Sequence, residues 1–118
     1  MNSNLEQRRA QHRQALKQGL EQAVARLSRL PEVERVILFG SYRRGRRDLF
    51  TDLDLLVVMD SADNPVTRTA RLYRHLGGAI KVDLDLVTYS PQEFKQNQKS
   101  SFLKRVLATG EVIYKRVK

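Results

Sequence analysis

Two neighbouring stretches decide the fold of this chain: FGSYRRG at residues 39–45 and, after a short arginine-rich connection, TDLD at residues 51–54. The first stretch follows an apolar run, so Gly40 and Ser41 lie where a buried strand is expected to give way to a helix start. Backbone N–H groups at such a turn point outward and bind anions. The turn is therefore a candidate phosphate site.

The second stretch carries a pair of carboxylates. Asp52 and Asp54 are two residues apart in a strand-like segment, so both side chains are expected on one face of it. Two adjacent carboxylates repel each other unless a cation neutralises them. Because Mg²⁺ prefers hard oxygen ligands, the pair is a candidate magnesium site.

A resemblance to a known family follows from the spacing of these two stretches. Gly-Ser, ten residues and Asp-x-Asp together resemble the signature of the minimal nucleotidyltransferases, a small branch of the DNA polymerase β-like superfamily. Thr51 replaces the usual Ser and Arg43 stands where a small residue is common, but neither departure removes a catalytic group. The matching positions are Gly40, Ser41, Arg44, Gly45, Asp52 and Asp54.

A two-ion Mg²⁺ site is implied by this resemblance, with Asp52 and Asp54 as catalytic residues and metal ligands. A third carboxylate from a neighbouring strand normally completes such a site, and Asp83 and Asp85 are the two candidates. Both are expected on the same face of one strand, so periodicity does not choose between them. The stretch 85–93 resembles the third acidic position of the family and favours Asp85, whereas Val-Asp-Leu at residues 82–84 keeps Asp83 as the alternative.

The same resemblance implies a nucleoside triphosphate, ATP, as the substrate. Gly40 would let the backbone approach the phosphates, and Ser41 would bind the β- or γ-phosphate through its hydroxyl and its N–H. Arg44 is the candidate triphosphate clamp, because a guanidinium binds phosphate oxygens through two parallel hydrogen bonds. No pattern in the sequence identifies the residues that hold the base.

The composition favours a compact intracellular protein. The chain has 118 residues and no cysteine, so a single domain spanning residues 1–118 is expected, without disulfides or thiolate metal sites. Neither a signal peptide nor an apolar run of bilayer length is found, so no membrane association and a cytoplasmic location are expected. The net charge of +9 attracts polyanions and disfavours a polycationic acceptor.

Helical and strand-like patterns alternate along the chain. Together with the resemblance they predict an α/β (α+β) fold of the polymerase β type, a mixed sheet flanked by helices, with an N-terminal helix in residues 1–30 and a motif-bearing core in residues 33–114. A capping box with proline, SPQE at residues 90–93, opens a late helix that is expected to break near residues 99–101. The other expected elements are strands at 33–39, 52–59, 80–87 and 112–114 and helices at 41–47 and 65–75.

The resemblance also implies a partner. Many minimal nucleotidyltransferases are encoded beside a small helical HEPN protein, in pairs that resemble toxin–antitoxin modules. In such pairs AMP passes from ATP to a tyrosine of the toxin. The leading hypothesis is therefore a Mg²⁺-dependent adenylyltransferase that acts on a HEPN toxin as its antitoxin. The alternatives are a non-catalytic module that binds a nucleotide or a partner, an RNA-directed nucleotidyltransferase, and a small-molecule nucleotidyltransferase.

Overall fold

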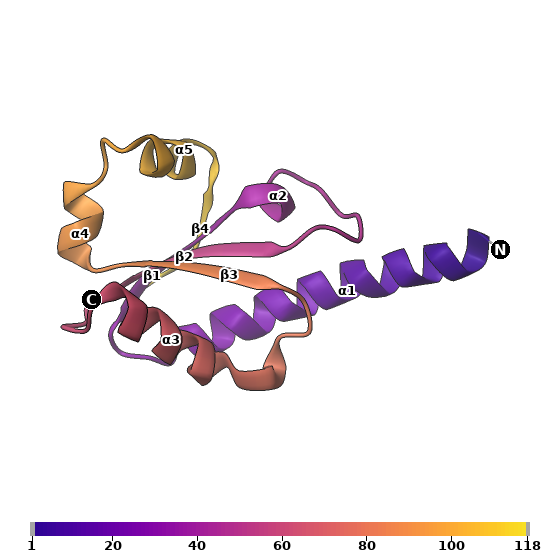
Figure 1. The fold of residues 1–118 in the computed structure, drawn as a ribbon, viewed down its shortest axis with the longest axis horizontal. Helices are drawn as coiled ribbons and strands as arrows, with labels where there is room; N and C mark the ends of the chain where they lie inside the picture. The colour runs from indigo at the N-terminus through magenta and orange to yellow at the C-terminus, as the bar shows by residue number, and fades with distance from the viewer. Residues whose placement is uncertain (1, 118) are drawn as a thin grey trace.

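A four-stranded sheet forms the centre of the structure, a computed structural model that describes residues 2–117, with side chains from residue 4 onward (Figure 1). Its strands lie in the order β3-β2-β1-β4. Along the chain the elements are α1 (Asn2–Leu27), β1 (Val33–Phe39), α2 (Gly40–Arg43), β2 (Leu53–Met59), α3 (Pro65–Leu76), the 3₁₀ turn η1 (Gly77–Ala79), β3 (Leu84–Tyr89), α4 (Pro91–Gln96), α5 (Ser101–Thr109) and β4 (Glu111–Lys115).

The sheet is mixed, as predicted. β1 runs antiparallel to both β2 and β4, whereas β2 and β3 are parallel. A parallel pair needs a long crossover, and α3 supplies it between β2 and β3. The predicted mixed sheet flanked by helices is therefore confirmed.

Two apolar clusters cover the two faces of the sheet. Because side chains alternate along a strand, neighbouring residues of β1 serve different clusters: Val36 and Leu38 contact the α1 and α3 side, while Ile37 contacts the α4 and α5 side. Ala23 and Leu27 of α1 anchor the first cluster. Figure 1 shows this layering, with α1 and α3 below the sheet and α4 and α5 above it.

Helix α1 extends well beyond the sheet, and the molecule measures 52 × 29 × 27 Å along its principal axes (Figure 1). Leu16 is the first buried side chain among those described, so the preceding turns are mostly solvated. The helix ends at Leu27, and hydrogen-bonded turns continue to Leu30. The predicted helix in residues 1–30 is therefore right in kind but ends earlier.

Two predicted boundaries are wrong for identifiable reasons. The strand predicted at 80–87 is Leu84–Tyr89, because its partner β2 begins only at Leu53, which pairs with Leu84. Ile80 and Val82 instead pack against Gly19 of α1, which has no side chain to exclude them. The helix predicted at 41–47 ends at Arg43, since Gly45 has a left-handed φ of 98°.

Within residues 2–117 no helix has the length and apolarity needed to cross a membrane. The capping box predicted at residues 90–93 is present, with Ser90 and Glu93 each bonding the other's backbone N–H. The predicted break between two late helices is also present, between Gln96 and Ser101.

Candidate functional site

The turn after β1 and the carboxylate of Asp54 are in direct contact. Gly40 has a φ of 81°, a conformation that L side chains rarely adopt. A Cβ at this position would overlap the carboxylate of Asp54, which lies across from the end of β1 through the Phe39–Asp54 pair. Only glycine therefore allows the backbone of the turn to lie against the acidic group. The two halves of the sequence motif form one site.

Asp54 and Asp85 are neighbours on the two parallel strands, because the register pairs these two residues directly. Burial raises the pKa of Asp54, and the negative charges of Asp85 and Asp52 raise it further. The positive charge of Arg44 acts to lower the pKa of the same carboxyl. Asp83 precedes β3, and its carbonyl accepts a hydrogen bond from the N–H of Leu53. The register therefore brings Asp85, rather than Asp83, beside Asp54.

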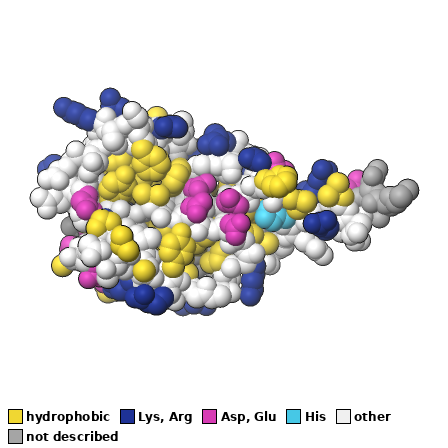
Figure 2. Space-filling model, in the orientation of Figure 1, with side chains coloured by type: hydrophobic (Ala, Val, Ile, Leu, Met, Phe, Trp, Pro, Cys, Tyr) yellow, Lys and Arg dark blue, Asp and Glu magenta, His cyan; other side chains and the backbone are white. Residues whose placement is uncertain are grey.

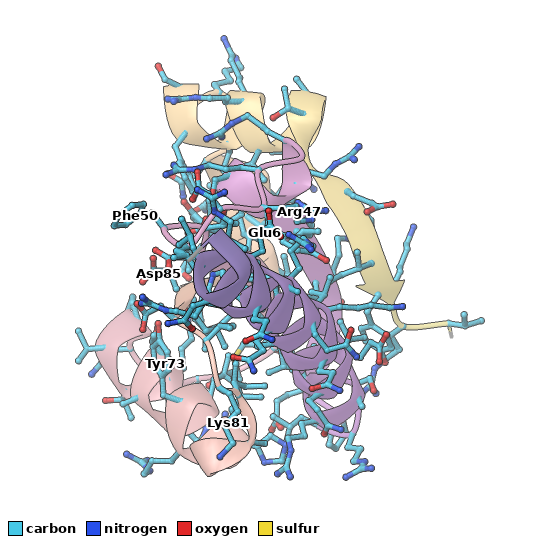
Figure 3. The ribbon with its side chains drawn as sticks, turned by 90° about the vertical axis from the view of Figure 1, so that its right-hand side faces the viewer. Glu6, Arg47, Phe50, Tyr73, Lys81 and Asp85 are labelled. Carbon is cyan, nitrogen blue, oxygen red and sulfur yellow. The ribbon has the colours of Figure 1, made fainter. Side chains whose placement is uncertain are left out.

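Tyr73 of α3 fixes the backbone on either side of Asp85. Its hydroxyl donates to the carbonyl of Leu84 at 3.0 Å and accepts from the N–H of Leu86 at 2.8 Å. β3 is an edge strand, so these bonds satisfy backbone groups that no further strand pairs. Figure 3 shows Tyr73 and Asp85 on the same side of the molecule. The sequence provided no signal for this role, because the tyrosines are scattered along it.

A hydrogen-bonded loop holds the segment before Asp52. The carboxylate of Asp48 accepts from the N–H of Phe50 at 2.9 Å and from the hydroxyl of Thr51 at 3.3 Å. His12 of α1 donates through Nε2 to the carbonyl of Thr51 at 3.0 Å, since a carbonyl can only accept. The Thr51 side chain is buried, so the hydroxyl at this family position stabilises the loop.

The four arginines of the connection have different environments. Arg47 lies over the ring of Tyr42, 3.6 Å from its centroid, and donates to the Tyr42 carbonyl at 2.7 Å. Arg46 pairs with Asp48 at 2.7 Å. In the part of the chain that the structure describes, Arg43 and Arg44 form no ion pair. Of these two, only Arg44 borders the cavity beside Asp54.

That cavity, of about 320 Å³, lies between the turn and α5. Its motif side is lined by the candidate phosphate residues Gly40, Ser41 and Arg44 and by the carboxylate residue Asp54. The sequence did not predict the other wall of the cavity, which α5 forms. The helical spacing of the α5 residues is visible in the sequence, but only the fold shows that α5 crosses near the turn. The α5 residues at the cavity are Phe102, Arg105, Val106 and Thr109.

The acidic residues fit a magnesium ion that a substrate helps to hold. In the part of the chain with described side chains, no group of three or more potential ligands surrounds a metal position. Mg²⁺, however, is commonly bound by one or two carboxylates together with substrate phosphates. Burial and the negative charges of Asp85 and Asp52 raise the pKa of Asp54, and such a cation would relieve the repulsion among these carboxylates. Figure 2 shows acidic side chains near the middle of a surface whose Lys and Arg side chains lie mostly toward its edges.

A family model described as polymerase beta, nucleotidyltransferase matches residues 21–118. The comparison with curated proteins finds no significant match.

Solved structures with the same fold include three informative examples. A toxin–antitoxin structure with AMP-PNP is 24% identical, with a TM-score of 0.57, covering 81% of this chain and 73% of the other. A nucleotidyltransferase structure from Sulfolobus solfataricus is 22% identical, with a TM-score of 0.52 and coverage of 92% and 84%. A structure of tri-AMPylated Shewanella oneidensis HEPN toxin in complex with MNT antitoxin is 20% identical, with a TM-score of 0.50 and coverage of 83% and 73%. These similarities confirm the fold.

Proposed function

Because the chain belongs to the polymerase beta nucleotidyltransferase family, we propose that it transfers AMP from ATP to a tyrosine hydroxyl of a HEPN toxin and thereby acts as an antitoxin. The observation that carries the transfer reaction is the contact between Gly40 and Asp54. It places an anion-binding turn against a group of carboxylates, which is the arrangement that a triphosphate with its cation requires.

The reaction would join the acceptor oxygen to the α-phosphorus of ATP and break the bond to the α,β-bridging oxygen, releasing pyrophosphate. Bound Mg²⁺ would supply charge neutralisation for the phosphates. Ser41 would bind the β- or γ-phosphate, and Arg44 would hold the triphosphate with paired hydrogen bonds. Both residues line the cavity that contains Asp54.

The carboxylates would divide the remaining tasks. Asp52, Asp54 and Asp85 are the proposed metal ligands, and the register that pairs Asp54 with Asp85 supports Asp85 over Asp83 as the third member. Asp85 is exposed and is therefore open to an incoming acceptor. It would also take the proton of the attacking hydroxyl, as a carboxylate within reach of the nucleophile can.

The acceptor is proposed by analogy with the solved relatives. One of them holds a tri-AMPylated HEPN toxin beside an MNT antitoxin, and another holds a toxin–antitoxin pair with AMP-PNP. ATP is a cytoplasmic metabolite, so the reaction is expected in the cytoplasm. The net charge of +9 suits an acidic partner surface.

The test is a transfer assay with α-labelled ATP, Mg²⁺ and the product of the neighbouring gene as the candidate toxin. The wild type should label the partner, and Asp54→Asn should reduce the labelling rate by roughly a thousandfold or more, because the central metal ligand is lost. Asp63→Asn, an acidic side chain in the loop before α3, is the matched control and should retain full activity. Labelling that survives in Asp54→Asn would refute the site, and no labelling by the folded wild type would refute protein AMPylation.

A further inference from the structure

The wall that α5 contributes to the cavity is a single helical face. Its four lining residues are at positions 102, 105, 106 and 109, the spacing that aligns side chains on one side of a helix. Val106 is only 3% exposed and packs into the core. The ring of Phe102 meets the edge of Phe39 at 86°, with centroids 5.5 Å apart. The apolar part of the wall is therefore held firmly before any ligand binds.

Arg105 adds a positive charge to this apolar wall. Its side chain is exposed, and within the described residues it forms no ion pair, like Arg44 on the opposite side of the cavity. Two unpaired guanidinium groups from different elements therefore border one cavity. The turn at Gly40 and Ser41 borders it as well. This concentration of donors fits a ligand with several negative charges.

The size and polarity of the cavity limit the ligand further. A volume of about 320 Å³ is at the lower end of the range for small-molecule sites. Its lining combines an aromatic and aliphatic surface with cationic groups, so the ligand needs an apolar planar part and a polyanionic part. A nucleoside triphosphate has both, whereas inorganic polyphosphate lacks the planar group.

We propose that α5 is the nucleoside-recognition element of the site, with Phe102 contacting the nucleoside and Arg105 binding the polyphosphate opposite Arg44. This inference rests on the proposed nucleotidyl transfer and adds the residues that hold the base and the second charge. An arginine is suited to the task because its planar fork binds two phosphate oxygens at once.

The test is calorimetric binding of α,β-methylene-ATP with Mg²⁺, which measures affinity without turnover. Arg105→Gln should weaken binding roughly tenfold or more, because a charge-assisted contact to phosphate is lost. Arg105→Lys should recover part of that affinity. Lys104→Gln is the matched control, since it removes the same charge from an exposed neighbouring position on α5 that does not line the cavity. It should bind like the wild type.

Two further ligands separate the phosphate and nucleoside contributions. The effect of Arg105→Gln should be smaller for AMP than for α,β-methylene-ATP, and tripolyphosphate should bind the wild type more weakly than α,β-methylene-ATP does. Equal affinity of Arg105→Gln and wild type for α,β-methylene-ATP would overturn the role of Arg105 while leaving nucleotidyl transfer intact. Tripolyphosphate binding as tight as that of α,β-methylene-ATP would overturn the nucleoside wall. A folded wild type that binds no nucleotide would overturn both the inference and the proposed function.

Discussion

Two polar regions at opposite ends of β3 differ in whether their charged groups have partners of opposite sign. At the end that leads into α4, Arg68 of α3 is 2% exposed, yet its Nε and Nη2 groups both have partners. It donates to the hydroxyl and carbonyl of Thr88, at 2.9 and 3.0 Å, and to the carboxylate of Glu93. At the start of the same strand, Asp85 lies beside the like-charged Asp54.

The pKa directions of the carboxylates express this difference. Hydrogen bonding from the Ser90 backbone and pairing with Arg68 lower the pKa of Glu93. Burial and neighbouring carboxylates raise the pKa of Asp54. A chain selected only for stability would not retain the second arrangement, because like charges without a cation oppose folding. The region around Arg68 therefore stabilises the fold, and the acidic region is the one that we propose binds a ligand.

The largest expected effect comes from breaking the paired region. Arg68→Met should lower the free energy of unfolding by about 3 kcal/mol, because the groups around Thr88 lose buried hydrogen bonds and Glu93 loses its cation. Urea denaturation followed by circular dichroism measures the change. Transfer activity of the folded fraction should stay near the wild-type value, since none of these residues lines the cavity.

Arg74→Met is the matched control for this change. Arg74 lies on the same helix but is exposed, so its removal should alter stability by less than about 0.5 kcal/mol. If Arg68→Met and Arg74→Met unfold at the same urea concentration, the buried network does not stabilise the fold, and the contrast between the two regions fails.

The second-largest effect is expected from breaking the contact between Gly40 and the carboxylate of Asp54. Gly40→Ala should lower stability by about 2 kcal/mol, because it adds backbone strain and pushes a methyl group into the Asp54 carboxylate. Displacing that carboxylate should also slow transfer by roughly a hundredfold. Thermal unfolding and the labelling assay measure the two effects separately.

Gly45→Ala separates strain from the contact. Gly45 also has a positive φ, 98°, but a Cβ there meets no atom within 4 Å. It should therefore lose only about 1 kcal/mol of stability, from strain alone, and retain most of its activity. Equal activity losses in the two variants would show that backbone strain, and not the Gly40–Asp54 contact, causes the loss.

The same contrast explains how much could be predicted from the sequence. Local chemistry predicted the strand 33–39, the Ser90–Glu93 capping box and the break between α4 and α5, because each depends on neighbours in the chain. The phosphate turn and Asp52-x-Asp54 were also predicted, and the structure joins them. Their catalytic roles remain predictions.

What the sequence could not predict depends on contacts between distant segments. The resemblance favoured Asp85 and periodicity did not choose, so the physical support for Asp85 over Asp83 comes from the register of β3 on β2, which depends on where β2 begins. The cavity wall with Arg105 required the position of α5 relative to the turn, and the Tyr73 bonds required α3 to lie beside β3. Helical spacing shows which residues share a face, but only the fold shows what that face contacts.

The smallest effect concerns the stability of the acidic region itself. Without metal at neutral pH, Asp54→Asn should be more stable than the wild type by less than about 1 kcal/mol, because it removes a like charge that lies partly exposed beside Asp85. The folded pKa of Asp54 is raised, so its charge disfavours folding above that value and is lost as the pH falls through it. Thermal unfolding in EDTA between neutral and acidic pH should therefore show the difference between the two proteins shrinking.

Comparing the two proteins isolates Asp54, because Glu93 acts equally in both. The lowered pKa of Glu93 means that its contribution is present at neutral pH and is lost as the pH falls through the folded-state value, which destabilises wild type and variant alike. Added Mg²⁺ should stabilise the wild type more than Asp54→Asn, because the carboxylate attracts the cation. A variant less stable than the wild type in EDTA at neutral pH would mean that the carboxylates are already compensated within the protein, and that their grouping needs no cation to explain it.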